Sequence, residues 1–145
     1  MTWDYEASAG ENSERELPAL ARGYFASGRD AMDKTRSPRE LHRFRIKTKR
    51  FRYALEMFQP VYGAAMEPRL ERLQQLQRIL GKISDLYTIR KLLKDDYGCG
   101  KELYREGRKR IEEFREHWRT VFDAPGEEEA WVATLNSTMR ADALR

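Results

Sequence analysis

The chain has 145 residues, of which 40% are hydrophobic and 36% charged, with a net charge of +4. This length and apolar content suit one domain with a single core, and they exclude a largely disordered chain. There is no apolar run near the roughly 20 residues that cross a bilayer, no signal-peptide pattern, and only one cysteine, Cys99. We therefore expect a cytoplasmic protein with no internal disulfide, no metal site and no membrane contact.

The N-terminal third predicts a tail followed by a helix. Residues 1–12 are expected to form a flexible acidic tail, and residues 13–145 a single helical bundle domain. Ser13 and Glu16 have the spacing of a capping box, whereas Pro18 favours a helix that starts nearer Leu17. Apolar residues at helical spacing then continue to about residue 32.

The second predicted helix has a strong start and carries most of the positive charge. Ser37 is the expected N-cap, Pro38 the first helical residue, and Glu40 completes the capping pattern. The helix should run to about Gln59, where Pro60 and later Gly63 end it. Residues 36–53 hold eight Lys or Arg and one acid, a local charge of +7, which leaves −3 for the rest of the chain. This concentration predicts an anionic partner.

Three further segments complete the bundle. The third helix begins near residues 66–68 and fades at the DDYGCG turn, with Gly81 as a bend; its apolar row is Leu70, Leu73, Leu76, Leu80, Ile83 and Tyr87. The fourth covers roughly residues 101–122, and a last amphipathic segment uses Trp131, Leu135 and Met139. No alternating strand pattern competes with these helices. The predicted fold is all-α, a compact bundle of four main helices plus a short C-terminal helix.

Basic residues of the second helix form a stripe. At about 100° per residue, the positions that share one side, beside the predicted core face, are His42, Arg45, Lys49 and Arg52. Arg43 and Lys47 fall on another side and read as an ordinary solvated face. The stripe is about 15 Å long. Such a row suits a flexible polyanion, because Arg binds phosphate oxygens through planar paired donors and Lys supplies a compact charge.

Apolar positions flank this stripe on both sides, which indicates that it lines a groove. Tyr53 is expected in the core or the groove wall, and Glu56 should orient the cations rather than perform chemistry. His42 adds a hydrogen-bond donor. The alternative is a solvated helix face whose cations pair with Glu40 and Glu56.

The fourth helix repeats this design, with cations and acids sorted onto different strips. If it packs beside the second helix, the two basic strips would face one another across a channel. The predicted second-wall contacts are Arg105, Arg108 and Arg115. The alternative is that these arginines form ion pairs, for which Glu112 lies within their strip.

Two segments together resemble a known family. The segment LHRFRIKTKRFRYALEMF is similar to the signature of the CHAD family, α-helical domains named for their histidines, and especially to the later of that domain's two repeats. The matching positions are His42, Arg45, Ile46, Lys49, Arg52, Tyr53 and Glu56. The segment RLQQLQRILGKISDLYTIRKLL resembles the helix that follows, through Leu76-Gln77, Leu80-Gly81 and Asp85.

This resemblance implies a helical bundle that binds inorganic polyphosphate through a basic surface without turning it over. It implies no catalytic residue and no cofactor. It also implies a cytoplasmic location, where the protein can associate with polyphosphate granules. The usual domain has two four-helix repeats, whereas this chain has room for one. Either one bundle suffices, or two chains associate as a homodimer.

The residue pattern alone also fits other functions. A general polyanion or nucleic-acid (RNA or DNA) binding helical domain would have the same basic stripe. An interaction domain could instead receive an acidic protein segment in its groove. The chain has no Gly-rich phosphate loop, Glu-x-x-His or Asp-x-Asp motif, which favours a binding protein over an enzyme.

Overall fold

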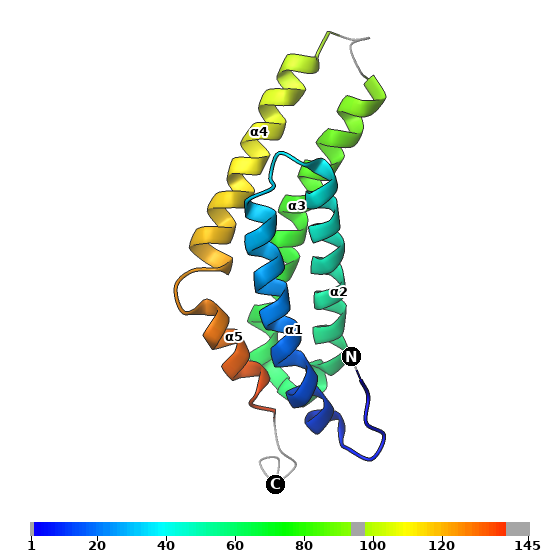
Figure 1. Ribbon diagram of the computed structural model, residues 1–145, viewed down its shortest axis with the longest axis vertical. Helices are drawn as coiled ribbons and strands as arrows, with labels where there is room; N and C mark the ends of the chain where they lie inside the picture. The colour runs from blue at the N-terminus through cyan, green and yellow to red at the C-terminus, as the bar shows by residue number, and fades with distance from the viewer. Residues whose placement is uncertain (1, 94–97, 139–145) are drawn as a thin grey trace.

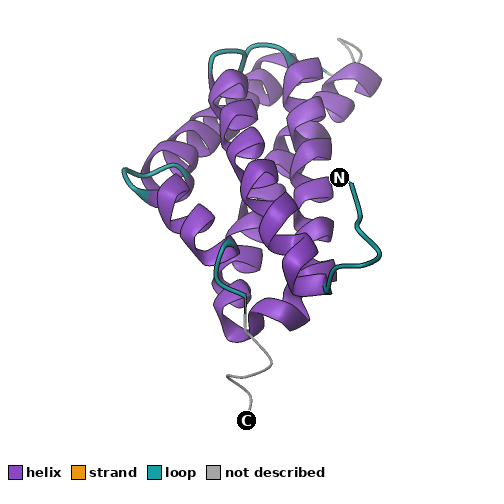
Figure 2. Ribbon diagram, turned by 60° about the horizontal axis from the view of Figure 1, so that its bottom comes forward, coloured by secondary structure: helices purple, strands orange, loops and turns teal. Residues whose placement is uncertain are grey.

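The computed structural model describes residues 2–93 and 98–138, and within these ranges it consists of helices and loops, with no strand (Figure 2). The elements in chain order are α1 (Ala9–Met32), α2 (Pro38–Tyr62), the 3-10 turn η1 (Gly63–Met66), α3 (Glu67–Leu93), α4 (Gly100–His117), the π-helical turn η2 (Trp118–Phe122) and α5 (Glu127–Leu135). The predicted all-α bundle is confirmed. Of the residues expected to carry the last segment, Met139 lies outside the described ranges.

The helices are arranged so that α2 and α4 lie diagonally across the bundle (Figure 1). Helix α1 packs against α2, α2 against α3, and α3 against α4, while α5 returns along α1. The fourth helix therefore does not run beside the second, as a channel between their basic strips would require. This diagonal placement decides which cations can share a surface.

Helix α1 begins earlier than the sequence predicts. Ser8 is its N-cap: the Ser8 hydroxyl accepts from the Glu11 amide at 3.1 Å, and the Glu11 carboxylate accepts from the Ser8 amide at 2.9 Å. Ser13 is instead buried inside the helix, and Pro18 also lies within it. The predicted boundary between residues 12 and 13 thus falls inside α1, because the capping box that forms is the earlier one, Ser8 with Glu11.

Helix α2 starts as predicted but ends later. The Ser37 side chain accepts from the Glu40 amide, and Pro38 is the first helical residue. Pro60 does not stop the helix, which continues to Tyr62 and ends at Gly63, whose φ of 65° lies in the left-handed region. A proline near the end removes one helical hydrogen bond, whereas a glycine at positive φ turns the chain out of the helix.

The core face of α2 follows a seven-residue repeat. Its buried residues are Leu41, Phe44, Thr48, Phe51, Leu55, Phe58 and Tyr62. These positions alternate in steps of three and four, the spacing that keeps one seam of a helix facing its neighbours along its whole length. The seam therefore does not drift around α2, and residues beside it hold a constant position relative to the core.

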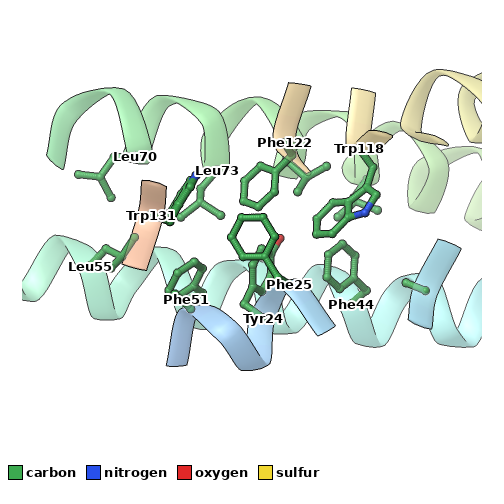
Figure 3. Close-up of a cluster of buried hydrophobic side chains, with 14 of the residues drawn as sticks. Tyr24, Phe25, Phe44, Phe51, Leu55, Leu70, Leu73, Trp118, Phe122 and Trp131 are labelled. Atoms are coloured by element: carbon green, nitrogen blue, oxygen red, sulfur yellow. The ribbon is translucent and has the colours of Figure 1, made fainter. Parts of the chain in front are cut away.

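Aromatic rings fill the centre of the bundle (Figure 3). Tyr24 stacks on Phe44 and Phe51 at centroid distances of 5.2 and 4.8 Å. Its hydroxyl forms a 2.6 Å hydrogen bond with Thr48, which itself donates to the Phe44 carbonyl. This buried polar pair is satisfied within the core. Trp118 and Trp131 are both buried.

Trp118 lies at the start of the π-helical turn η2 and packs its ring against Gly28 of α1. The wider turn is closed by the Asp123 amide, which donates to the Trp118 carbonyl five residues earlier. Trp118 also stacks on Phe122 at 5.0 Å. The glycine allows the indole to approach the α1 backbone closely, so this contact depends on the absence of a side chain at position 28.

Helix α3 runs unbroken from Glu67 to Leu93, so Gly81 does not bend it out of helical geometry. Five of the six residues in its predicted apolar row are buried, whereas Tyr87 is 45% exposed. None of the helices within residues 2–93 and 98–138 combines the length and the apolar character that a bilayer crossing requires.

His117, at the end of α4, should make folding stability depend on pH. Its Nε2 is buried without a hydrogen-bond partner in the described part of the chain. Burial lowers the pKa of this imidazole, opposed by the charge of Glu113 and assisted by that of Arg72. The folded state thus favours the neutral imidazole. The contribution of His117 to folding stability is therefore fully present above about pH 6.5 and is lost as the pH falls through the lowered pKa.

In the His117→Gln variant this contribution should be missing. Urea unfolding near pH 7.5 and 5.0 should therefore show a smaller acid-induced loss of stability in the variant than in the natural protein. An equal loss in both proteins would assign the acid sensitivity to other groups.

Candidate functional site

The basic stripe of α2 borders its core seam. Each member directly follows a core residue along the chain: His42, Arg45, Lys49, Arg52 and Glu56 come after Leu41, Phe44, Thr48, Phe51 and Leu55. Because the seam keeps a seven-residue repeat, the stripe keeps it too. The stripe therefore runs along one side of α2 without winding away from the neighbouring helix.

That neighbour is α3, and a surface groove of about 450 Å³ lies between the two helices. We call it the α2–α3 groove. Its lining residues are Arg45, Arg52, Gln74, Gln77, Arg78, Gly81, Lys82 and Asp85. Four of these are cations, two from each helix, and one is an acid. Such a lining offers an anion charged donors from both walls.

Gly81 shapes the floor of the α2–α3 groove. A Cβ atom built at this position would lie 3.8 Å from Nη2 and 3.9 Å from Nε of Arg45, with no other neighbour within 4 Å. The guanidinium thus rests over the glycine, against the α3 backbone. This packing explains the glycine of the Leu80-Gly81 pair, because a longer side chain at position 81 would occupy the place of the Arg45 guanidinium.

Three polar atoms in this groove are buried without a hydrogen-bond partner among the described residues: Nε of Arg45, Nε of Arg52 and Oε1 of Gln77. Buried polar groups in proteins are almost always paired, so unpaired ones that line a groove mark a place where water or an anion can bind. Both arginine atoms are donors. The Gln77 side chain can present donors as well, because a 180° rotation of its amide group exchanges the positions of the oxygen and the NH₂ group.

Arg52 is held in position by two neighbours on its own helix. Its Nε lies 3.6 Å from the Glu56 carboxylate, which is close enough for an ion pair but long for a hydrogen bond. Its guanidinium lies over the exposed Tyr53 ring, 5.0 Å from the centroid. Tyr53 and Glu56 thus support Arg52, and Tyr53 is not part of the core.

The two remaining stripe residues lie beside the groove lining. Lys49, which lies between Arg45 and Arg52 in the sequence, is half-buried. His42, one helical turn before Arg45, is exposed. Neither has a hydrogen bond or an ion pair that joins it to the described protein. Both are available to a ligand that extends along α2.

An acidic hollow bounds the groove at its other end. This hollow, of about 700 Å³, contains the carboxylates of Glu56, Glu67 and Glu71, and Gln74 belongs to both linings. The charge of the surface between α2 and α3 thus reverses near Gln74. An anion seated on Arg45 and Arg52 is expected to extend toward His42 and not toward Glu67.

The α4 arginines do not form the opposite wall. Arg115 donates to the buried Thr35 hydroxyl at 3.2 Å, Arg108 lines a different hollow near Tyr104, and Arg105 is exposed. The expectation of a channel between α2 and α4 was wrong, because it assumed that these helices pack side by side. Whether any of the three binds an anion stays a prediction.

Sequence reasoning missed the second wall, Arg78 and Lys82 of α3. Both are exposed and lie four residues apart, one on each side of Gly81 in sequence. The signal was present: with Gln74 and Asp85 they share the helix side that carries the small residue. Acids and bases are sorted more clearly on α4, so the stronger sequence signal for a second basic strip lies there. No cluster of three or more His, Cys, Asp or Glu side chains suitable for a metal occurs in the described ranges.

Comparison with known proteins identifies the family. A family model described as the CHAD domain matches residues 3–94, which contain α1, α2, α3 and both walls of the α2–α3 groove. The match ends before α4. No curated protein and no solved structure matches the chain. Since the family model covers more than half of the residues, this chain belongs to the CHAD domain family.

Proposed function

We propose that this domain binds inorganic polyphosphate in the α2–α3 groove and does not turn it over. The observation that carries the proposal is the pair of buried Nε donors, on Arg45 and Arg52, that form no hydrogen bond within the described protein, Arg52 having only its 3.6 Å ion pair with Glu56. Phosphate oxygens are among the acceptors with which a guanidinium forms its strongest, charge-assisted hydrogen bonds. Arg78 and Lys82 add charge from the facing wall.

A chain of phosphates suits this surface better than a single phosphate. The cations of α2 recur at intervals of about one helical turn, so successive phosphates can meet successive side chains. Each contact releases counterions, and several contacts on one ligand add their free energies. No aromatic ring lines the groove within the described residues. Stacking platforms for bases, which single-stranded nucleic acids use, are therefore missing from its lining.

The experiment is a calorimetric titration with long-chain polyphosphate at about 150 mM salt, near physiological ionic strength. Lys49→Glu with Arg52→Glu should abolish binding while circular dichroism shows unchanged helicity. The matched control is Arg43→Glu with Lys47→Glu, which changes the charge of the same helix equally but lies off the stripe. It should cost much less. Equal losses from both pairs would mean a diffuse positive field and no groove.

Ligand competition separates polyphosphate from other anions. The same titration with single-stranded RNA, duplex DNA and a polyglutamate peptide should give much weaker binding. Comparable affinity for RNA or DNA would establish a general polyanion or nucleic-acid binding domain instead. Preference for polyglutamate would indicate an acidic protein partner. Salt dependence alone would not decide, because all these complexes weaken as salt rises.

A further inference from the structure

A second hollow, of about 340 Å³, lies on the opposite side of α3 from the α2–α3 groove. It is bounded by the last turns of α3, by α4, by the turn that joins α1 to α2, and by the first turn of α2. We call it the Tyr104 pocket. Its lining residues are Thr35, Arg36, Pro38, Leu41, Ile83, Leu86, Tyr87, Arg90, Tyr104, Gly107, Arg108 and Ile111. It shares no residue with the α2–α3 groove.

The charge of this pocket is one-sided. Arg36, Arg90 and Arg108 all line it, and no carboxylate does so within the described part of the chain. None of the three arginines forms an ion pair with a described acid. Without an anion, three neighbouring guanidinium groups repel one another, so the arrangement favours an anionic occupant.

The arginines converge on Tyr104. The guanidinium carbons of Arg90 and Arg108 lie 5.2 and 6.0 Å from the centre of its ring, and Arg108 donates to its hydroxyl at 3.4 Å. The hydrogen bond and charge of Arg108, with the charges of Arg36 and Arg90, lower the pKa of this phenol. The same field would act on any anion placed beside Tyr104.

The floor of the pocket is apolar, unlike that of the α2–α3 groove. Leu41 and Ile83 are buried, and Leu86 and Ile111 are half-buried beside them. The rings of Tyr87 and Tyr104 are 45% and 49% exposed at its walls. A bare phosphate would leave this apolar surface in contact with water. A flat organic ring would cover it and contact the tyrosines.

From these observations we infer that the Tyr104 pocket is a second binding site, for a small organic anion with a flat ring and a phosphate or carboxylate group. The ring lies against Tyr104 and the apolar floor, and the anionic group meets Arg108 and Arg90. The volume is within the range of small-molecule sites. This site is independent of the proposed polyphosphate groove, because the two lie on opposite sides of α3.

The test is calorimetric titration of the full chain with 1-naphthyl phosphate and with 1-naphthoate, which separate a phosphate from a carboxylate head group. Inorganic phosphate lacks the ring and 1-naphthol lacks the charge. We expect at least one of the aromatic anions to bind about tenfold or more tighter than both partial ligands. A charge-assisted hydrogen bond contributes about that factor relative to 1-naphthol, and burial and stacking of the ring contribute about that factor relative to inorganic phosphate. Equal binding of inorganic phosphate and the aromatic anions would overturn the inference.

Variants locate the site. Arg108→Gln and Tyr104→Ala should each weaken the aromatic anion about tenfold, whereas Lys109→Gln, the next residue on α4 and outside the lining, should leave it unchanged. Arg78→Glu with Lys82→Glu should also leave it unchanged, even if that pair destroys polyphosphate binding. Loss of the aromatic anion in the α3 variant, or its retention in both pocket variants, would contradict a separate site.

Discussion

Reversing Arg78 and Lys82 of α3 to glutamate is expected to weaken polyphosphate binding by at least about 100-fold. Each residue contributes a charged donor to the α2–α3 groove from the wall opposite Arg45 and Arg52. Loss of two charge-assisted contacts corresponds to about 3–6 kcal/mol, and the new carboxylates would repel the ligand. Both side chains are exposed, so the fold should tolerate the change. Calorimetry gives the affinity and circular dichroism the helicity.

The matched control is Arg105→Glu with Lys109→Glu on α4. This pair has the same four-residue spacing and the same change in charge, and both side chains are exposed. Neither lines the groove. We expect a change of less than about fivefold, of the kind that a distant charge causes through a screened field. If the α4 pair lowered the affinity for polyphosphate more than the α3 pair, the α4 arginines and not the α2–α3 groove would form the second wall of the site.

The second large effect concerns stability: Gly28→Ala should destabilise the fold by about 3 kcal/mol, at the upper end of overpacking effects. A Cβ atom at position 28 would overlap three ring atoms of Trp118. That indole is buried and stacks on Phe122, so it cannot turn away without disturbing the aromatic core. Thermal unfolding should show a midpoint lower by about 6–12 °C for a chain of this size.

Gly23→Ala, on the same helix, is expected to change the stability in the opposite direction. Gly23 is exposed, and a Cβ atom there meets nothing within 4 Å. The substitution should stabilise the protein by about 0.5–1 kcal/mol, because alanine loses less conformational entropy than glycine in a helix. If both substitutions stabilised the protein, the close contact between Gly28 and Trp118 would not exist in solution.

Much of the fold could be predicted from the sequence because local signals and core periodicity agree. Ser37 and Pro38 mark the start of α2 by local chemistry alone, and the structure confirms them. The start of α1 was missed since two capping patterns compete there, and only packing decides between them. The π-helical turn at Trp118 has no local signal of this kind. It arises where the indole must fit against Gly28, a contact between residues 90 positions apart in the chain.

The candidate site was predicted on one side only. The stripe on α2 can be found from helical spacing, because its cations and its core residues share one repeat. The opposite wall depends on which helix packs beside the stripe, and that is a property of the whole bundle. Arg78 and Lys82 share a helix side with Gly81, but that side is recognised as a groove wall only once Gly81 is known to pack against Arg45. Helical periodicity assigns residues to faces, but it does not pair the faces.

On α2 the stripe residues and the core residues are neighbours in the chain, so the proposed anion recognition depends on correct assembly of the bundle. Arg45 follows Phe44, and Arg43 precedes it, so a one-residue shift of the helix that moved Phe44 into the place of Arg45 would also move Arg43 into the place of Phe44. Charges would enter the interior and phenyl rings would enter the groove. A misaligned bundle therefore loses its internal packing and its anion surface in the same step. Ligand retention, for instance on a phosphate-bearing column, would select the correctly aligned molecules from a mixture of variants.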